Sequence, residues 1–266
     1  MRSYLARLGL GGAEKRMGPS RAPDTPAMLA PTVESLKRLH LRHLQRVPFE
    51  NLDIHRGIPI ILEEEHILSK IVERGRGGFC YELNTAFAWL LRKLGYSVRL
   101  LAAEVARNEG GFGIPFDHMT LLVEPEKENG SYLADVGFGD SFLFPLPLRV
   151  GEAEMPSGDR YRLRQQELWW NVDRRSKGAS AFEPQYRFTL VPRRLHDFIA
   201  GCHYHQTSPH STFTRGPVCS IALADGRLTL SCDKLVAIRN GIRTETPIPS
   251  REEWTRALKQ HFGVEL

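Results

Sequence analysis

Several features that define particular protein classes are missing from this sequence of 266 residues. No apolar run comes near the roughly 18 residues that a membrane-spanning helix requires, so no membrane span is expected. The net charge is +5, but Lys and Arg are scattered, without a long basic block or a basic motif interleaved with aromatic residues. A nucleic-acid partner is therefore not favoured. The charge indicates either a solvated basic surface or attraction of an anionic partner such as a phosphorylated cofactor.

Cysteine is also scarce, and the N-terminus lacks a secretory pattern. The four cysteines are Cys80, Cys202, Cys219 and Cys232, and no two of them form a Cys-x-x-Cys pair. This excludes a disulfide-dense scaffold and favours free thiols in a reducing compartment. The first residues carry charge but are not followed by a hydrophobic block, so no signal peptide is expected. We therefore expect a soluble, cytoplasmic protein in which one thiol could be reactive.

The remaining composition is typical of a folded protein with a substantial core. Hydrophobic residues make up 41% and charged residues 25% of the chain, which is near the average for globular domains. Apolar residues at helical spacing predict helices in the N-terminal third and at the C-terminus, with Thr32 and Ser250 as N-caps. The predicted elements are a short N-terminal helix, an irregular Gly- and Pro-rich connector over 9–31, and helices over 32–48, 63–73, 80–93 and 250–262.

The pattern changes after residue 94. Short β-branched or alternating runs are separated there by Gly, Asn and Pro, which is typical of strands joined by turns. We predict strands over 98–105, 119–124, 132–136, 160–164, 168–173, 186–190, 218–223, 227–231 and 234–239. The fold class is therefore α+β, with a helical N-terminal third, a β-rich middle and a mixed C-terminal segment.

Cys80 is the most promising candidate for chemistry. It follows an Arg-Gly-Gly-Phe loop and begins a predicted helix, where the helix dipole and free backbone N–H groups favour a thiolate. The same N–H groups could donate to a developing oxyanion. Alternatively, the residue is an inert, buried small hydrophobe, which is a common role for a single cysteine.

His118 and Asp135 are candidate partners for this thiol. His118 stands at the entry of one predicted strand and Asp135 at the end of the next. If the two strands are neighbours, both side chains can converge beside Cys80. His118 would then accept the thiol proton and Asp135 would orient the imidazole. From spacing alone, both could equally be ordinary residues at strand ends.

Three motifs give the sequence a family resemblance. Residues 76–84, Arg-Gly-Gly-Phe-Cys-Tyr-Glu-Leu-Asn, resemble the signature of the arylamine N-acetyltransferases. Residues 48–52 resemble the upstream segment of that family, and 135–139 its strand-end motif, and the resemblance covers nearly the whole chain. It implies a helical bundle over 1–93 with the nucleophile, a β-barrel over 94–195 with His118 and Asp135, and an α/β lid over 196–266.

The resemblance also implies an activity. Acetyl-CoA would acetylate Cys80, and an arylamine, hydrazine or arylhydroxylamine would then take the acetyl group, a chemistry suited to xenobiotic metabolism. No metal is expected, and the protein would be a monomer or a homodimer. Three alternatives remain: an amide synthase that closes a macrolactam, a thiol hydrolase or transglutaminase-like enzyme, and a catalytically silent binding protein.

The resemblance suggests further binding residues. Apolar rings should line the acceptor pocket, and the candidates are Phe49, Phe138 and Phe213. The Gly-rich loop over 108–115 matches the phosphate-contacting loop of the family, although Pro115 removes one possible N–H donor. The candidate CoA contacts are Gly113, Phe116, Tyr204 and His210. A metal site in the segment rich in His and Cys over 196–210 is not favoured, because the ligand spacing is irregular.

Overall fold

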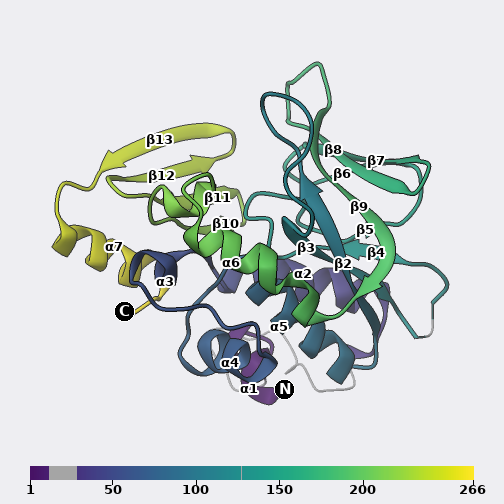
Figure 1. The fold of residues 1–266 in the computed structure, drawn as a ribbon, viewed down its shortest axis with the longest axis horizontal. Helices are drawn as coiled ribbons and strands as arrows, with labels where there is room; N and C mark the ends of the chain where they lie inside the picture. Colours follow the sequence, from purple (N-terminus) through teal and green to yellow (C-terminus); the bar gives the residue numbers. More distant parts are fainter. Residues whose placement is uncertain (12–28, 127) are drawn as a thin grey trace, which may run out of the picture.

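The computed structural model describes residues 1–11, 29–126 and 128–266. Most of the predicted connector over 9–31 lies outside the described residues. Figure 1 shows a helical layer in the lower part of the molecule and two β-sheets above it. The mixed helix and sheet architecture confirms the predicted class. Among the described helices, none combines the length and the apolar character that crossing a bilayer requires.

The N-terminal helices form around one apolar core. Thr32 caps α2, because its hydroxyl accepts a hydrogen bond from the Ser35 N–H at 3.2 Å. The apolar face of α5 includes Leu83, Phe87 and Leu90, which are fully buried. These elements are α1 (Arg2–Arg7), α2 (Val33–Arg46), α3 (Leu52–His55), α4 (Glu64–Leu68), a π-helical turn η2 (Ser69–Glu73) and α5 (Cys80–Lys93).

The larger sheet has eight antiparallel strands in a nearly closed, barrel-like arrangement. Its strand order is β5-β4-β3-β2-β9-β8-β7-β6, and its inner face packs apolar residues such as Leu101, Tyr161 and Phe188. The strands are β2 (Ser97–Val105), β3 (His118–Glu124), β4 (Tyr132–Ala134), β5 (Leu146–Pro147), β6 (Gly151–Glu154), β7 (Arg160–Gln166), β8 (Trp169–Arg175) and β9 (Glu183–Arg193).

The smaller sheet joins a short strand of the helical N-terminal third to the C-terminal segment. Its order is β1-β10-β11-β12-β13, and Leu258 and Phe262 of α7 pack against one face. β1 (Phe49–Glu50) comes from the helical region, and pairs Glu50 with Cys219 of β10. The other elements are η3 (Leu195–Phe198), α6 (Ile199–Thr207), η4 (Thr212–Thr214), β10 (Cys219–Leu223), β11 (Gly226–Leu230), β12 (Lys234–Arg239), β13 (Ile242–Pro247) and α7 (Arg251–Phe262).

Sequence patterns missed two elements of this C-terminal region. Every residue of β13 is exposed, so the strand has no alternation of apolar and polar residues. The helix α6 buries Gly201, Cys202 and His205 instead of a periodic apolar face. Both elements are stabilised by pairing or packing partners that lie outside their own segments, and periodicity alone does not reveal them.

Candidate active site

Most of the predicted site residues meet in one cavity. The cavity has a volume of about 740 Å³ and lies between α5, the strand ends of the larger sheet and the segment that contains α6 and η4. Eight of the residues proposed from sequence line it: Phe49, Cys80, Gly113, His118, Phe138, Tyr204, His210 and Phe213. Asp135 lies behind His118, and Phe116 is not among the lining residues.

Cys80 is the first residue of α5 and is 3% exposed. The preceding loop is tightly packed, which fixes the start of the helix. A Cβ atom on Gly77 would overlap the carbonyl oxygen of Pro48, so only glycine fits at this position. The Glu82 carboxylate accepts a hydrogen bond from the backbone N–H of Phe79 at 3.2 Å. This bond caps the helix directly beside the thiol.

His118 and Asp135 are brought together by neighbouring strands, as the sequence suggested. β3 pairs antiparallel with β4 in a register that matches Leu121 with Ala134. His118 is the first residue of β3, and Asp135 directly follows β4. His118 Nε2 lies 2.6 Å from Asp135 Oδ2. This contact leaves Nδ1 as the imidazole nitrogen that can act on a nucleophile.

Asp135 is fully buried and held by several donors. Its Oδ1 accepts hydrogen bonds from Asn84 Nδ2 and from the Gly137 N–H, each at 3.0 Å. Burial would raise the pKa of Asp135, but the imidazole of His118 and these donors outweigh it and lower the pKa. The residue therefore remains a carboxylate at neutral pH and can stabilise an imidazolium.

Cys80 departs from the sequence-based expectation. Burial raises the pKa of its thiol well above the ordinary value, and the Asp135 carboxylate adds to this rise. A hydrogen bond from the Met119 backbone N–H lowers the thiol pKa, but this effect is smaller than the rise caused by burial. The expectation of a net lowered thiol pKa at the start of the helix is therefore wrong, because burial dominates. Forming the thiolate requires a base in the cavity, because the desolvated anion is not stable by itself.

A buried histidine of α2 supports the same site, although the sequence analysis assigned it no role. His40 Nδ1 lies 2.9 Å from the Leu143 carbonyl oxygen, and its Nε2 accepts a hydrogen bond from the Asp135 N–H at 3.1 Å. Because a carbonyl only accepts and an N–H only donates, His40 must be neutral with its proton on Nδ1. Its place within α2 gave no sequence signal for this contact.

We expect acid to destabilise the fold through His40 and its neighbour His43. Burial lowers the pKa of His40 to about 4 and that of His43 to about 3. The unfolded chain binds these protons first, so stability falls as pH drops from about 6.5 towards the folded-state values. Each histidine should cost about 1.4 kcal/mol between pH 7.5 and 5.5. Urea unfolding at both pH values measures this, and His43→Gln should remove about half of the difference.

Gly137 forms part of the wall behind the nucleophile. An added Cβ would lie 2.7 Å from both Cys80 Cα and Asn84 Nδ2. We predict that Gly137→Ala displaces Cys80 and lowers kcat by about 10²-fold, because a shift of about 1 Å at a reacting group has an effect of that size. Steady-state kinetics, with circular dichroism to verify folding, test this. Gly178→Ala is the control for strain away from the cavity, because this exposed residue has φ of +84° but an added Cβ meets nothing within 4 Å.

Aromatic rings surround the reacting groups. The ring centroids of Phe138 and His118 are 5.2 Å apart, and Tyr186 of β9 lies 5.3 Å from His118. Phe49 and Phe213 face each other at 6.1 Å. Phe49, Phe138 and Phe213 all line the cavity and give its wall an apolar, aromatic character. Tyr186 carries no motif, and the pairing of β9 with β2 brings it to the site.

The Gly-rich loop is packed more tightly than a free phosphate cradle. The Gly113 N–H donates to the Val105 carbonyl at 2.7 Å, and a Cβ on Gly113 would overlap the Asp117 carboxylate. Glycine is thus required here for close packing, and its amide is already engaged. Phe116 packs against Phe198 of η3, with ring centroids 5.3 Å apart.

Two arginines and one histidine–aspartate pair at the cavity were not predicted from the sequence. Arg107 and Arg215 both line the cavity and are exposed. Because the basic residues are scattered in sequence, no motif identified them. His205 Nε2 lies 3.1 Å from Asp117 Oδ1, and its Nδ1 is 3.0 Å from Ser211 Oγ.

In the part of the chain that the structure describes, no group of three or more His, Cys, Asp or Glu residues could hold a metal ion.

Comparisons with known proteins agree with this geometry. A family model described as N-acetyltransferase matches residues 32–266. The chain is 33% identical over 237 residues to the arylamine N-acetyltransferase / N-hydroxyarylamine O-acetyltransferase of Salmonella typhimurium, with 88% of this chain and 83% of that protein covered. It is 30% identical over 267 residues to the arylamine N-acetyltransferase of Mycolicibacterium smegmatis, with 99% and 91% covered.

The fold of this chain is also similar to a solved structure over almost its whole length. It is that of Mycobacterium marinum arylamine N-acetyltransferase in complex with CoA, which superposes with a TM-score of 0.83. The sequence identity is 28%, and the match covers 98% of this chain and 92% of that one. The shared fold therefore includes all the elements that build the cavity.

Proposed function

The chain belongs to the arylamine N-acetyltransferase family, and from this premise we propose that it transfers acetyl groups from acetyl-CoA to aromatic amines through a thioester on Cys80. Hydrazines and arylhydroxylamines are further acceptors in this proposal. One observation carries it. Cys80 and His118 line the same cavity, and Asp135 holds the imidazole of His118 from behind at 2.6 Å.

In the first half-reaction, Cys80 becomes acetylated. His118 Nδ1 takes the thiol proton as Sγ attacks the carbonyl carbon of acetyl-CoA. Asp135 stabilises the resulting imidazolium, which offsets the high intrinsic pKa of the buried thiol. Backbone N–H groups in the first turn of α5 face the developing oxyanion. The carbon–sulfur bond to CoA then breaks, and the proton passes from His118 to the leaving thiolate.

In the second half-reaction, an amine accepts the acetyl group. The neutral amine attacks the thioester carbon, His118 removes the amine proton, and the bond to Cys80 Sγ breaks. The proton returns to the cysteine, which restores the starting enzyme. An aromatic amine suits this step because its low basicity keeps it unprotonated at neutral pH. The rings of Phe49, Phe138 and Phe213 provide the apolar contact for it.

The exposed residues of the cavity suit the phosphates of CoA. Arg107 and Arg215 are exposed lining residues that supply positive charge, and His210 and Tyr204 line the same cavity. We propose that the two arginines take the place of the engaged Gly113 amide as principal phosphate partners, since a guanidinium binds phosphate oxygens in a bidentate manner. The CoA complex of the Mycobacterium marinum protein supports this choice of cosubstrate.

The thioester is the decisive intermediate to test. Intact and peptide mass spectrometry after mixing with acetyl-CoA, without an acceptor, should show one acetyl group on Cys80 that anisidine then removes. Cys232 is the internal control, because it is the exposed cysteine and would react first in nonspecific acetylation. Acetylation of Cys232 alone, or a Cys80 adduct that an arylamine does not discharge, would contradict the proposal.

A further inference from the structure

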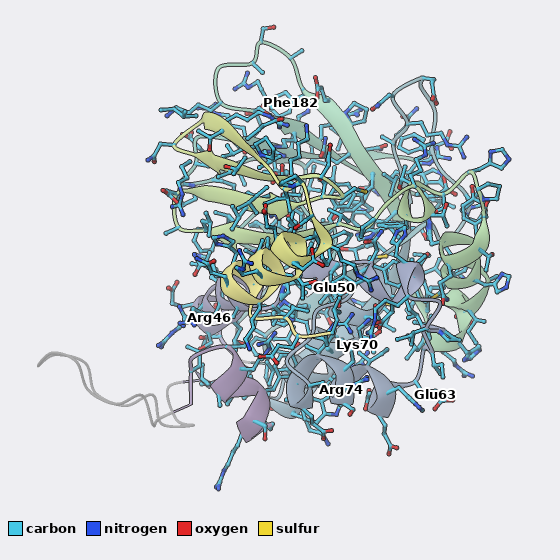
Figure 2. The ribbon with its side chains drawn as sticks, turned by 90° about the vertical axis from the view of Figure 1, so that its left-hand side faces the viewer. Arg46, Glu50, Glu63, Lys70, Arg74 and Phe182 are labelled. Atoms are coloured by element: carbon cyan, nitrogen blue, oxygen red, sulfur yellow. The ribbon has the colours of Figure 1, made fainter. Side chains whose placement is uncertain are left out.

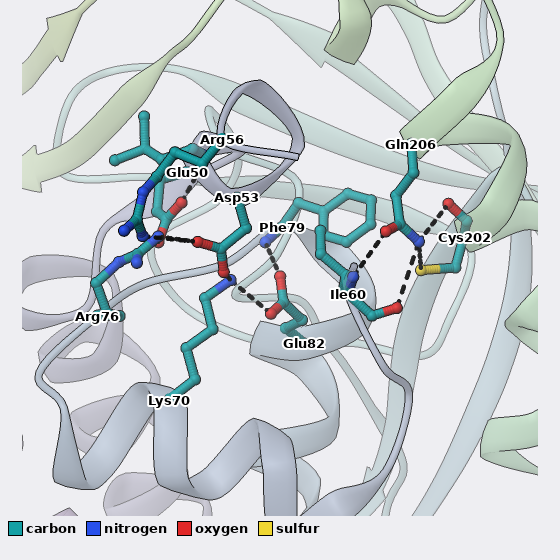
Figure 3. A network of polar contacts seen from close by, with 11 residues as sticks. Glu50, Asp53, Arg56, Ile60, Lys70, Arg76, Phe79, Glu82, Cys202 and Gln206 are labelled. Carbon is teal, nitrogen blue, oxygen red and sulfur yellow. Dashed lines mark hydrogen bonds and ion pairs between the residues drawn. The ribbon is translucent and has the colours of Figure 1, made fainter. Parts of the chain in front are cut away.

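A network of buried charges lies beneath the loop that leads to Cys80. Figure 3 shows its members, which come from β1, α3, η2, the loop after η2 and α5. Lys70 Nζ lies 2.7 Å from both Asp53 Oδ2 and Glu82 Oε1. Arg76 binds Glu50 Oε1 at 2.8 Å and Asp53 Oδ1 at 2.9 Å. Glu50 and Lys70, which are labelled in Figure 2, are both buried, with 0% and 5% exposure.

The Lys70 arm of this network leads directly to the nucleophile. Lys70 contacts one carboxylate oxygen of Glu82, and the other oxygen accepts the Phe79 N–H. Phe79 immediately precedes Cys80, and its own side chain offers no hydrogen-bond acceptor. A single chain of contacts therefore runs from Lys70 through Glu82 to the peptide group that positions Cys80.

Lys70 supplies the cation that pairs with the Glu82 carboxylate in a site almost closed to solvent. Both side chains are buried, with 6% and 3% exposure. Burial raises the pKa of Glu82, whereas Lys70 and the Phe79 N–H lower it in part. Without the ammonium group the buried carboxylate would lose its cation while the charge of Glu50 still acts on it, and both effects favour uptake of a proton. A neutral carboxyl group is a weaker acceptor for the helix-terminal N–H than a carboxylate.

We propose that Lys70 is a positioning residue for the nucleophile, which acts through Glu82 and the Phe79 N–H to fix Cys80 where His118 can deprotonate it. This inference rests on the proposed function, in which Cys80 is the nucleophile. A purely structural role would instead change the stability of the protein and leave the reactivity of Cys80 in the folded state unchanged.

The test combines one disruptive, one compensating and one control variant. In Lys70→Met, a buried cation is lost. In Lys70→Met/Glu82→Gln, the unpaired charge is removed while an amide oxygen remains to accept the Phe79 N–H. Lys259→Met removes a lysine from an exposed ion pair with Glu265 and is the control. For each protein we would measure the rate of Cys80 alkylation by iodoacetamide against pH, the kcat and KM of acetyl transfer, and the midpoint of thermal unfolding.

Lys70→Met should lower both the Cys80 alkylation rate at pH 7 and kcat by about 10-fold or more, and should change KM by about 2-fold at most, because the reacting group is misplaced. The double variant should recover most of this reactivity, and Lys259→Met should match the parent protein. A lower unfolding midpoint with an unchanged alkylation profile would overturn the proposal. So would failure of the double variant to recover while it remains folded.

A second pair of variants covers the case in which Lys70→Met does not fold. Glu82→Ala removes the acceptor of the Phe79 N–H, whereas Glu82→Gln retains it. The inference requires Cys80 to react more slowly in Glu82→Ala than in Glu82→Gln, and equal rates would overturn it. Alkylation needs no acyl donor, so the alkylation rates test the role of Lys70 and Glu82 independently of acetyl transfer. A parent protein that fails to transfer acetyl groups would contradict the function alone.

Discussion

Replacing Asp135 by asparagine is expected to lower kcat for acetyl transfer by about 10³–10⁴-fold with little change in fold. The substituted side chain would present its amide group to His118 Nε2, which now lies 2.6 Å from a carboxylate oxygen. An N–H donor there stabilises the imidazole tautomer that carries its proton on Nδ1. That tautomer cannot accept the proton of Cys80, and the carboxylate that stabilises the imidazolium is lost as well.

The measurement is the rate of Cys80 acetylation in a single turnover, compared with steady-state kcat. Asp225→Asn is the matched control, because this aspartate pairs with Arg239 at 3.0 Å on the surface and is not among the residues that line the cavity. Asp225→Asn should leave both rates unchanged. A fall of less than about 10-fold in folded Asp135→Asn would mean that His118 is oriented by other contacts, and the proposed role of Asp135 would be wrong.

The second large effect is expected on stability. Arg76→Met should lower the free energy of unfolding by about 3–5 kcal/mol, because removing one partner of a buried ion pair leaves an uncompensated charge. Arg76 binds Glu50 Oε1 through two nitrogens, at 3.0 and 2.8 Å, and Glu50 is fully buried. Asp53 would retain Lys70, but Glu50 would lose its cation.

Urea unfolding at neutral pH measures this change. Arg164→Met is the matched control, because Arg164 also binds a buried carboxylate, that of Asp173, but Arg162 binds the same group at 3.0 Å. Arg164 is 45% exposed, so its loss should cost about 1 kcal/mol or less. Equal losses for the two variants would show that the Glu50–Arg76 pair has no special importance for folding.

Much of the catalytic constellation could be predicted because it depends on local order along the chain. The helix that begins at Cys80 follows from apolar periodicity after a glycine-rich loop, and Gly95, with φ of +94°, follows its end. His118 and Asp135 flank consecutive strands, and consecutive strands usually pair. The observed β3–β4 pairing brings the two side chains together for this reason.

Residues from distant elements could not be predicted in this way. Tyr186 reaches His118 only because β9 pairs with β2 in the barrel-like sheet. His40 meets the Asp135 backbone from a helix about one hundred residues earlier in the chain. The pairing of β1 with β10 likewise brings Phe49 opposite Phe213. Neither periodicity nor motif spacing contains information about these long-range contacts.

The sequence by itself determined the family, the mixed architecture and the candidate triad of Cys80, His118 and Asp135. The tertiary structure decided the electrostatic state of that triad. Burial raises the pKa of Cys80, whereas His118, Asn84 and the Gly137 N–H outweigh burial and lower the pKa of Asp135. Neither effect is visible in a linear pattern. Desolvation and partner distances depend on how the chain packs, so the reactivity of this thiol is a property of the fold.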